Sequence, residues 1–453
     1  MELDQLQSFK KVYFTSLGCS KNLVDSQVML GKLDSKGFEV THEPENADVI
    51  IVNTCAFIGP SKMESIETVL DLAEFKSKDQ GNCKALVMAG CLAQRYSQDL
   101  EKEMPEVDLF IGTGEYDKVA FYLRALEEGK LEKKSFVEIP KYIHTEFDPR
   151  INTSPSYMAW LKISEGCNRN CTFCIIPTLR GKLRSRTVSS LVAEAQKLAD
   201  QGVKEINLIS QDLSDYGVDL SAEDSLPNLL TSLEKVSGVE WIRLFYYYPD
   251  DLSEDVMRII SQSKKICKYL DMPIQHFSTA ILKKMNRRVT TEQIYAKINR
   301  LREYIPSIVL RTSVIVGFPG ETEEDFNLLL KGIEDLQFDH LGVFKYSDEE
   351  GTSAVNLKQK VSQDIIDARF EKVYKAQKKI LQKINKKMVN KVVEVLVEGP
   401  SEESEFLLQG RYQGQAPEID GNILINDGMA KPGDFVKVKI SKVIGYDYLG
   451  AII

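Results

Sequence analysis

The feature that most constrains the fold is an alternation of continuous apolar runs with helical patterns, which occurs in two separate series. Short apolar runs without polar interruption are typical of parallel strands buried on both faces. The first series has four such runs, at residues 11–18, 48–54, 84–90 and 108–112, with helical patterns at 22–37, 61–75 and 116–129. It therefore predicts a doubly wound α/β domain.

The second series predicts six more strands, at residues 157–164, 205–210, 241–248, 268–274, 307–318 and 340–347. Helical patterns lie between them, as at 189–202 and 323–337. Six β-α repeats are two short of a closed eight-fold barrel. The series therefore predicts a partial (β/α)6 barrel, with its chemistry at the C-terminal ends of the strands.

Changes in the residue pattern along the chain predict three domains, at residues 1–145, 153–388 and 389–453. The charged stretch at 127–153 is typical of a linker. After a long helical pattern at 363–388, the chain continues in short alternating strands broken by Gly and Pro. This last region predicts a small antiparallel β-barrel.

The compartment and the cysteine count together suggest metal ligation. The polar start lacks the apolar core of a signal peptide, and no apolar stretch reaches the roughly eighteen residues of a membrane span. We therefore expect a cytoplasmic protein with no membrane partner and with reduced thiols. Its eight cysteines then favour metal ligation or catalysis over disulfides. The formal net charge of -9 argues against a general nucleic-acid binder.

The sharpest motif is CNRNCTFC, which sets Cys167, Cys171 and Cys174 at a C-x3-C-x2-C spacing directly after a predicted strand. Three thiolates at this spacing can hold three irons of a four-iron cluster and leave the fourth iron open. A structural zinc site is one alternative, although no fourth Cys or His follows nearby. Three unrelated buried cysteines are the other alternative.

This spacing, with Phe173 before the last cysteine, resembles the radical SAM superfamily. The resemblance implies that S-adenosylmethionine (SAM) chelates the open iron through its amino and carboxylate groups. Reductive cleavage of SAM then gives a 5′-deoxyadenosyl radical. The resemblance thus implies an iron–sulfur enzyme that starts radical chemistry.

Several residues outside the motif are candidates for SAM contacts. Ser313 begins SVIVGFPGET, which looks like the superfamily's adenine-side element, and its Gly317 and Gly320 would let the backbone approach a ligand. Gln211 and Asp212 follow the second barrel strand at its mouth. The basic loop after the triad can attract a carboxylate of SAM or of a substrate, or can simply be solvated; it comprises Arg180, Lys182, Arg184 and Arg186.

Three other cysteines share one topological position, because each follows a predicted strand of the first domain. They are Cys19, Cys55 and Cys91. The carboxyl ends of strands in a doubly wound sheet line one crevice, so these thiols predict a second cluster. Separate core cysteines remain the alternative, and Cys83 and Cys267 lack this placement and are expected to be ordinary thiols.

Six segments together resemble the methylthiotransferases over nearly the whole chain: SLGCSKNLVDSQ, NTCAFI, AGCLAQRY, GCNRNCTFCIIPTLRGKLRSR, MPIQHFSTAILKKMNRR and VIVGFPGET. The resemblance implies an auxiliary 4Fe-4S cluster on Cys19, Cys55 and Cys91 that carries sulfur, a 4Fe-4S cluster on Cys167, Cys171 and Cys174 that cleaves SAM, and a C-terminal TRAM barrel. Ser20, Ala56 and Leu213 depart from the usual Pro, Gly and Thr, but none of these changes removes a cluster ligand.

Within the family, SLGCxKNLVDS, SQDxSxYG and APEIDG (416–421) resemble the RimO branch more than the tRNA-modifying MiaB branch. RimO-type enzymes methylthiolate the β-carbon of an aspartate in ribosomal protein S-twelve. The resemblance therefore implies S-twelve or the small ribosomal subunit as partner, no direct tRNA substrate, and an electron donor such as flavodoxin or ferredoxin.

Charge offers an independent check on the substrate. Residues 390–453 carry six Lys and Arg against ten Asp and Glu. An acidic barrel suits a basic ribosomal protein better than tRNA phosphates, although acidity can also serve solubility. The competing readings are a MiaB-like tRNA adenosine methylthiotransferase and, in another class, a non-catalytic iron–sulfur carrier.

Overall fold

The computed structural model describes residues 9–453 and divides into two compact units. The first unit takes in the chain up to Thr153 together with Ser164–Arg169 and Cys174–Arg186. The second takes in Ser154–Ile163, Asn170–Phe173 and Thr187–Ile453. The second unit thus holds both the partial barrel and the C-terminal β-rich region, and the three-domain division stays a prediction.

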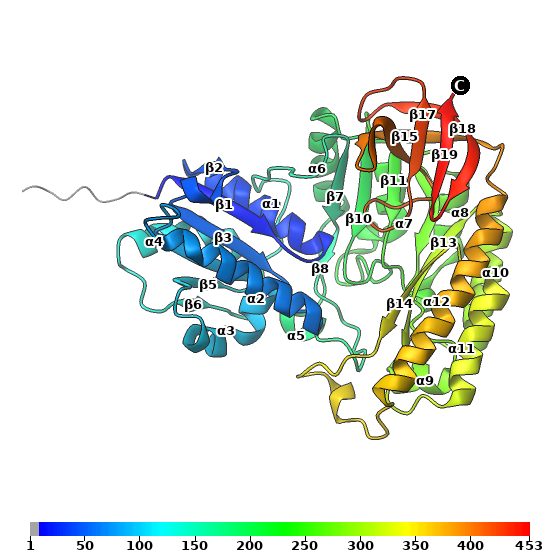
Figure 1. The fold of residues 1–453 in the computed structure, drawn as a ribbon, viewed down its shortest axis with the longest axis horizontal. Coiled ribbons are helices and arrows are strands. Elements are labelled where there is room, and N and C mark those ends of the chain that lie inside the picture. Colours follow the sequence, from blue (N-terminus) through cyan, green and yellow to red (C-terminus); the bar gives the residue numbers. More distant parts are fainter. Residues whose placement is uncertain (1–8) are drawn as a thin grey trace, which may run out of the picture. The chain divides into compact units, whose positions relative to one another are not determined.

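The first unit is built on a six-stranded parallel sheet in the order β2-β1-β3-β4-β5-β6 (Figure 1). Its strands are β1 (Lys11–Ser16), β2 (Glu39–Thr41), β3 (Val49–Thr54), β4 (Ala85–Gly90), β5 (Leu109–Ile111) and β6 (Ser135–Phe136). Its main helices are α1 (Ser20–Asp34), α2 (Gly59–Ala73), α3 (Cys91–Glu103) and α4 (Val119–Glu127), with single 3-10 turns at Pro44–Asn46, Glu74–Lys76 and Tyr116–Lys118.

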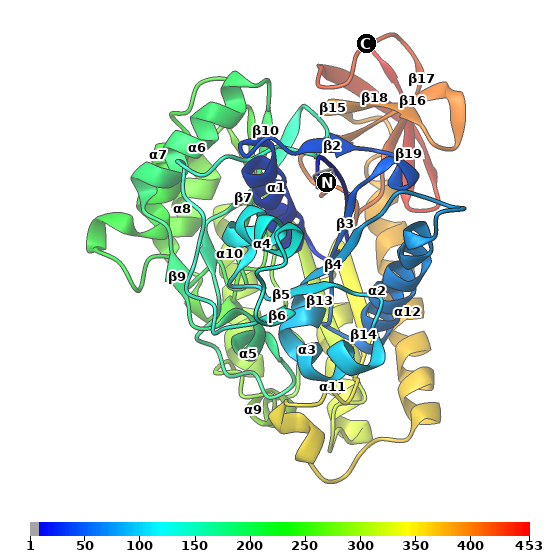
Figure 2. The ribbon, with the colours of Figure 1, turned by 90° about the vertical axis from the view of Figure 1, so that its left-hand side faces the viewer.

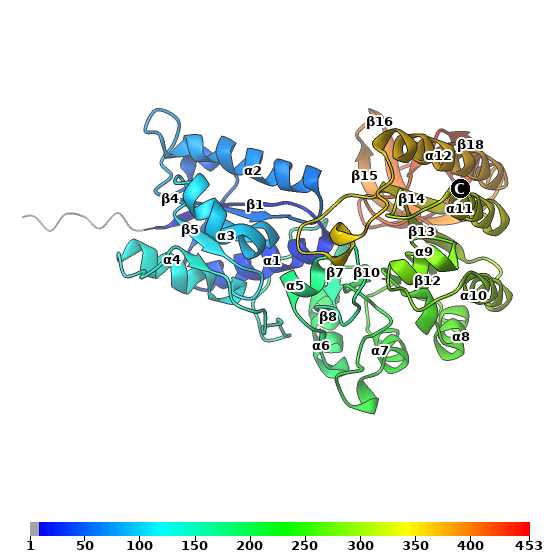
Figure 3. The same ribbon diagram turned by 90° about the horizontal axis from the view of Figure 1, so that it is seen from below.

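Both faces of this sheet are covered by helices, as the continuous apolar strands require. Alternate residues of β3 separate the two faces. Val49 and Ile51 pack with residues of α1 and α4, whereas Ile50 and Val52 pack with residues of α2 and α3. Figure 3 shows α2 on one side of the strands and α1 and α4 on the other. The predicted doubly wound domain is therefore confirmed.

The second unit contains an open parallel sheet in the order β14-β13-β12-β11-β10-β7, which we call the half-barrel. Its strands are β7 (Met158–Lys162), β10 (Glu205–Ile209), β11 (Trp241–Leu244), β12 (Ile266–Asp271), β13 (Val309–Val316) and β14 (His340–Lys345). The helices between them are α6 (Val188–Asp200), α7 (Leu226–Leu233), α8 (Glu254–Gln262), α9 (Thr279–Lys284), α10 (Thr291–Tyr304) and α11 (Glu323–Leu336). Six strands without closure confirm the predicted partial barrel.

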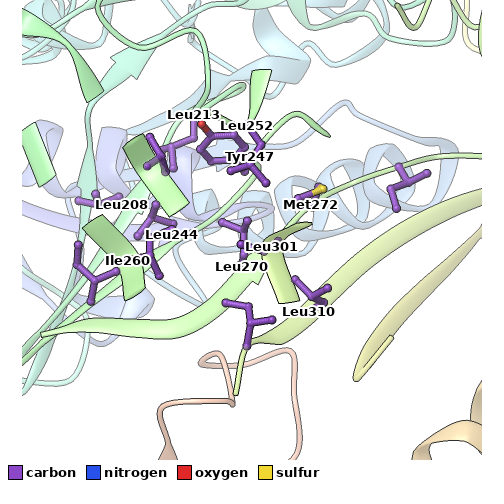
Figure 4. Close-up of a cluster of buried hydrophobic side chains, with 14 of the residues drawn as sticks. Leu208, Leu213, Leu244, Tyr247, Leu252, Ile260, Leu270, Met272, Leu301 and Leu310 are labelled. Carbon is purple, nitrogen blue, oxygen red and sulfur yellow. The ribbon is translucent and has the colours of Figure 1, made fainter. Parts of the chain in front are cut away.

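Alternation along the half-barrel strands gives each face its own chemistry. Leu208, Leu244 and Leu270 belong to one buried apolar cluster with Ile260 of α8 and Leu301 of α10 (Figure 4). The opposite face carries Trp160, Asn207, Arg243, Tyr269 and Arg311. The core of the second unit therefore lies between strands and helices, and the concave face is left to polar and aromatic groups.

The C-terminal region forms a closed barrel in the order β15-β16-β17-β19-β18, which we call the small barrel and which lies at upper right in Figure 2. It follows the long helix α12 (Gln363–Lys386). Its strands are β15 (Val392–Ser401), β16 (Ser404–Tyr412), β17 (Ile423–Asp427), β18 (Phe435–Ile444) and β19 (Asp447–Ile452). The β17–β19 pair is parallel, so the predicted antiparallel barrel contains one parallel junction.

The small barrel packs on the N-terminal ends of the half-barrel strands. Arg411 Nη2 lies 2.7 Å from Glu205 Oε2, and Trp241 meets the Phe435 ring edge-on at 4.9 Å. Glu205 and Trp241 are the first residues of β10 and β11. Within the second unit, the small barrel therefore occupies the end opposite to the carboxyl ends of the strands.

Two local predictions were wrong. The stretch at 127–153 is not only a linker, because β6 within it pairs with β5 and extends the first sheet. The strand predicted at 241–248 ends at Leu244, because Tyr246 has a φ of 59° that no strand accommodates. Among residues 9–453, no helix is both long and apolar enough to cross a membrane.

Candidate cluster-binding sites

The three cysteines of the first unit lie at the carboxyl ends of three neighbouring strands. Cys19 follows β1 and precedes α1, Cys55 follows β3 directly, and Cys91 is the first residue of α3 after β4. Because β1, β3 and β4 are adjacent in the sheet, these strand ends meet at one edge. The sheet order therefore brings together residues that are far apart in sequence.

Burial and neighbouring groups set the pKa values of Cys55 and Cys91. Burial raises the pKa of Cys91 to about 11; neighbouring Arg180 lowers this pKa, while Cys19 and Cys55 raise it further. Burial also raises the pKa of Cys55, with Cys19 adding to the rise. Metal binding would deprotonate these thiols.

Two glycines allow these strand ends to converge. Gly18, with a φ of 87°, lies so close to Cys55 that a Cβ placed on it would stand 2.7 Å from the Cys55 Cβ. Gly90, with a φ of 91°, leaves no room for a Cβ beside Asn53 Oδ1. The glycine that precedes Cys19 and the one that precedes Cys91 are therefore needed for both conformation and space.

A pair of asparagines fixes the loops around the first two thiols. Asn22 Nδ2 donates to the Leu17 carbonyl at 2.7 Å, and Asn53 Nδ2 donates to the Asn22 carbonyl at 2.9 Å and to Ser26 Oγ at 2.8 Å. Both asparagines are buried. The segments that hold Cys19 and Cys55 are thus joined by hydrogen bonds of the KNLVDS and VNT motifs, a role that the sequence reasoning did not assign.

Arg180 was a candidate for attracting a carboxylate of SAM or of the substrate from a basic loop. In the structure it contacts carboxylates of the protein instead. Arg180 ends the short helix α5 (Ile176–Arg180) and is buried within the first unit. Its guanidinium pairs with Asp25 and Glu165. Burial alone would lower its pKa, but Cys91 and these two carboxylates hold the pKa well above its usual range.

Two other basic residues of this loop, Arg184 and Arg186, also have partners in the first unit. Arg186 Nη1 lies 3.1 Å from His144 Nε2, and Arg184 donates to the carbonyls of Lys182 and Arg180. Lys182 is exposed. A contact of Arg186 with SAM stays a prediction.

The triad Cys167, Cys171 and Cys174 lies on the loop between β8 (Ser164–Glu165) and α5, and each of its cysteines is half-buried. In the first unit, Cys167 Sγ accepts from the Arg169 amide at 3.4 Å. In the second unit, Cys171 Sγ lies 2.9 Å from Tyr248 Oη, whose ring is covered by the Arg287 guanidinium at 3.6 Å. Tyr248 follows the carboxyl end of β11, the end where chemistry was predicted.

The donor set fits iron–sulfur clusters. All eight cysteines are free thiols, and thiolates are the usual ligands of such clusters. Residues 9–453 contain no three His, Cys, Asp or Glu side chains already arranged around a single metal ion. The assignment of the six cysteines to two clusters therefore stays a prediction, supported by the convergence of one set and the spacing of the other.

The glycine turn predicted for SAM has a packing explanation in the structure. Gly317 and Gly320 both have a φ of 78°, and a Cβ on them would collide with Ile366 of α12 and with Lys284 respectively. Glu321 accepts from the Gly317 and Phe318 amides and so fixes the turn. The close approach that these glycines permit is thus to protein atoms, and their contact with SAM stays a prediction.

The remaining SAM candidates lie where the sequence placed them along the strands. Ser313 is in β13, with its carbonyl accepting from the Gln275 amide at 2.8 Å. Gln211 and Asp212 follow β10, and Asp212 Oδ1 accepts from the Ser214 amide at 2.9 Å and from its hydroxyl at 2.5 Å. Asp212 therefore stabilises the turn after β10, and a ligand role for these residues is untested.

The APEIDG segment (416–421), used above as a branch marker, joins the small barrel to the half-barrel. Asp420 Oδ1 lies 2.7 Å from Arg311 Nη1, and Oδ2 accepts from Tyr269 Oη at 2.9 Å. His340 Nδ1 is 3.2 Å from the same carboxylate. The sequence did not predict the buried ion pair of Asp420, because no local pattern distinguishes a buried acidic loop residue from an exposed one.

Models of known families match three parts of the chain. Residues 11–112 match an uncharacterized protein family, UPF0004; residues 161–332 match the radical SAM superfamily; residues 389–453 match the TRAM domain. With the open parallel sheet and the cysteine loop after its first strand, these matches define a radical SAM enzyme carrying a TRAM barrel.

Relatives of similar length narrow the class. The chain is 49% identical over 444 residues to "Ribosomal protein uS12 methylthiotransferase RimO" of Myxococcus xanthus, covering 98% of this chain and 92% of that one. It is 48% identical to the protein of the same name in Geobacter sulfurreducens, covering 98% and 99%. The chain therefore belongs to the radical SAM methylthiotransferase family, in its RimO branch, and is an enzyme of the transferase class.

A solved structure supports the fold alone. The radical S-adenosylmethionine methyltransferase TsrM of Kitasatospora setae has a TM-score of 0.56 at 15% identity, covering 74% of this chain and 73% of that one. An iron–sulfur cluster and SAM are the cofactors of the superfamily to which this chain belongs.

Proposed function

We propose that this enzyme inserts a methylthio group at the β-carbon of an aspartate in ribosomal protein uS12. The observation that carries the proposal is the identity of 48–49% over almost the whole length with relatives of that name. Both cysteine sets and their strand-end positions fit this chemistry. Cys19, Cys55 and Cys91 follow the ends of β1, β3 and β4, and the other three predicted ligands lie on the loop between β8 and α5.

For the first step, Cys167, Cys171 and Cys174 would hold three irons of a four-iron cluster and leave the fourth open to SAM. When bound, this cluster supplies the electron that cleaves SAM to a carbon radical able to break an unactivated C–H bond. The protein's part is to orient the ligands and exclude water. Tyr248 Oη, 2.9 Å from Cys171 Sγ, supports this by fixing that sulfur at the carboxyl ends of the half-barrel strands.

For the second step, Cys19, Cys55 and Cys91 would hold a second four-iron cluster that carries the sulfur to be transferred. Support comes from the adjacency of β1, β3 and β4 and from the effect of Cys19 on the pKa values of Cys55 and Cys91. Gly18 and Gly90 allow the strand ends that carry these thiols to pack closely.

The choice of a protein over tRNA rests on the relatives rather than on the charge of the small barrel. Two of the ten acidic residues counted there, Glu398 and Asp420, are used in ion pairs with Arg411 and Arg311. The exposed surface carries Lys391, Lys431, Lys437, Lys439 and Lys442 against Glu394, Glu402, Glu403, Glu405, Glu418 and Asp427. This surface is nearly balanced, and no observation in the chain favours tRNA as the substrate.

The proposal includes a cytoplasmic setting and a low-potential electron donor such as a flavodoxin or a ferredoxin. Both follow from the need for reduced thiols and for a strongly reducing cluster. The electron donor would be a separate protein that binds this enzyme transiently.

The experiment that tests the proposal compares two substrates in one assay. The reconstituted, reduced enzyme is incubated anaerobically with SAM, with purified uS12 or small subunits, and with bulk tRNA, and each product is analysed by mass spectrometry. We expect the methylthio mass on a uS12 aspartate alone. Modification of tRNA without modification of uS12 would overturn the substrate, and absence of SAM cleavage would overturn the radical chemistry as well.

A further inference from the structure

One arginine of the first unit touches a thiol that is predicted to bind iron. Arg180 Nη2 donates to Cys91 Sγ at 3.3 Å and to Asn22 Oδ1 at 3.0 Å. Its Nη1 lies 2.5 Å from Asp25 Oδ2 and 3.3 Å from Glu165 Oε2. The side chains of Arg180, Asp25 and Glu165 are exposed by 2%, 4% and 1%.

Two buried carboxylates share the Arg180 guanidinium with the Cys91 thiol. Three cysteine thiolates at this edge of the sheet would add negative charge when they bind iron. Buried charge is costly unless it is compensated, and Arg180 is the cation that both carboxylates and Cys91 share.

The hydrogen bond to sulfur has a use beyond compensation of the carboxylates. Charge near an iron–sulfur cluster and hydrogen bonds to its sulfurs are among the main determinants of its reduction potential. A donor that holds a ligand in one orientation also supports the geometry of the site. A guanidinium provides both, because it keeps its charge and its donors have a fixed geometry.

We propose that Arg180 is a positioning residue for the second cluster, which holds the Cys91 sulfur by a charge-assisted hydrogen bond and makes the cluster easier to reduce. This inference rests on the proposed function of Cys19, Cys55 and Cys91 as its ligands. Arg180 contacts the sulfur of Cys91 rather than the substrate. It therefore acts on the orientation of that sulfur and on the electrostatic potential at the cluster.

Arg180 lies close in the sequence to the cysteines of the first triad. The helix α5 starts at Ile176, two residues after Cys174, and ends at Arg180. The short segment that contains the last cysteine of the first triad therefore also delivers the cation to Cys91. This helix belongs to the first unit.

The test measures the second cluster without the first. The full chain with Cys167→Ala, Cys171→Ala and Cys174→Ala is the parent, and its cluster potential is followed anaerobically by electron paramagnetic resonance during redox titration. Asp25→Asn in this parent removes one negative charge, so the midpoint potential should rise. Adding Arg180→Gln to Asp25→Asn restores the parent's net charge but removes the donor to sulfur, and the potential should fall below that of the parent.

The matched control is Arg124→Gln with Glu127→Gln, which removes an ion pair of 2.9 Å in the same unit without touching a thiol. Its potential should equal that of the parent. If Arg180→Gln with Asp25→Asn gave the same potential as Asp25→Asn alone, the inference would be wrong.

Two further outcomes are informative. If circular dichroism shows that the double variant does not fold, Arg180→Lys is tested instead. Lysine keeps the positive charge but lacks the paired N–H donors of the guanidinium. An altered resonance signal with the fold retained supports positioning, and an unaltered signal and potential overturn it. If the parent holds no iron, the proposed function of the second set fails, and this inference fails with it.

Discussion

The cysteines at 167–174 share one short loop, whereas Cys19, Cys55 and Cys91 are brought together only by the order β1-β3-β4 of a sheet. The spacing of the local set can be read directly from the sequence. The distributed set exists only when the first unit is folded, and it depends on glycines and asparagines that do not bind iron. The two sets should therefore fail in different ways.

The largest effect should come from removing the local set. Replacement of Cys167, Cys171 and Cys174 by Ala is expected to abolish SAM cleavage and to reduce iron after reconstitution from about eight to about four per chain. Iron analysis and the yield of 5′-deoxyadenosine measure both. Retention of all iron, or loss of all of it, would show that the two sets are not independent.

Removal of one thiol from the distributed set should separate the two activities. Cys55→Ala leaves the local set intact, so we expect 5′-deoxyadenosine to form while no methylthio product appears. Cys83→Ala is the control, since Cys83 is buried just before the amino end of β4, at the opposite end of that strand from Cys91. Loss of SAM cleavage in a folded Cys55→Ala variant would contradict the division of roles.

A change that leaves every ligand in place should still weaken the distributed set. Gly90→Ala forces a residue with a Cβ into a φ of 91° against Asn53, which should destabilise the first unit by about 1–3 kcal/mol and lower iron in the second site. Gly37→Ala, at a φ of 81° in open space, has the backbone strain without the collision.

Thermal unfolding and iron content compare the two glycine variants. The Gly37 variant should keep full iron with a smaller loss of stability. Equal iron loss in both variants would mean that general instability, not the space beside Asn53, explains the effect.

The smallest effect should come from a single hydrogen bond at the local set. Tyr248→Phe removes the hydroxyl that lies 2.9 Å from Cys171 Sγ, at a cost of about 1 kcal/mol. We expect the rate of SAM cleavage to fall by about fivefold, with iron in the second site unchanged. Tyr304→Phe, a surface hydroxyl bonded to Glu254, serves as the control. Loss of iron from the second site in Tyr248→Phe would count against the separation of the two sets.

The sequence predicted the parts of both sites that depend on spacing and strand order. Cys167, Cys171 and Cys174 are recognisable because the signal lies within one segment, and the second set follows from apolar runs that end in cysteine. The partners of Arg180 were not predictable, because Asp25, Glu165 and Cys91 are adjacent to it only after folding. Its spacing from Cys174 suggested a loop open to a carboxylate, and the actual carboxylates belong to the protein.

The same limit applies to charge in the small barrel. Counting residues made that barrel acidic, but composition does not tell which carboxylates are buried against arginines. Asp420 is exposed by 1% and pairs with Arg311 of β13, which lies far from it in the sequence. Conversely, the half-barrel and its helices were predictable because their strands repeat one simple pattern.

The buried contact between Glu205 and Arg411 has a practical consequence for anyone who cuts this chain into fragments. Burial alone would raise the pKa of Glu205, but Arg411 and Arg243 hold the pKa below its ordinary value. A fragment that stops before the small barrel strips Glu205 of one counter-ion and leaves Trp241 without Phe435. Truncation at the end of α12 would therefore leave a buried carboxylate with less compensation and an uncovered aromatic ring, which should destabilise the fragment at neutral pH. The two barrels are best expressed, purified and melted as one piece.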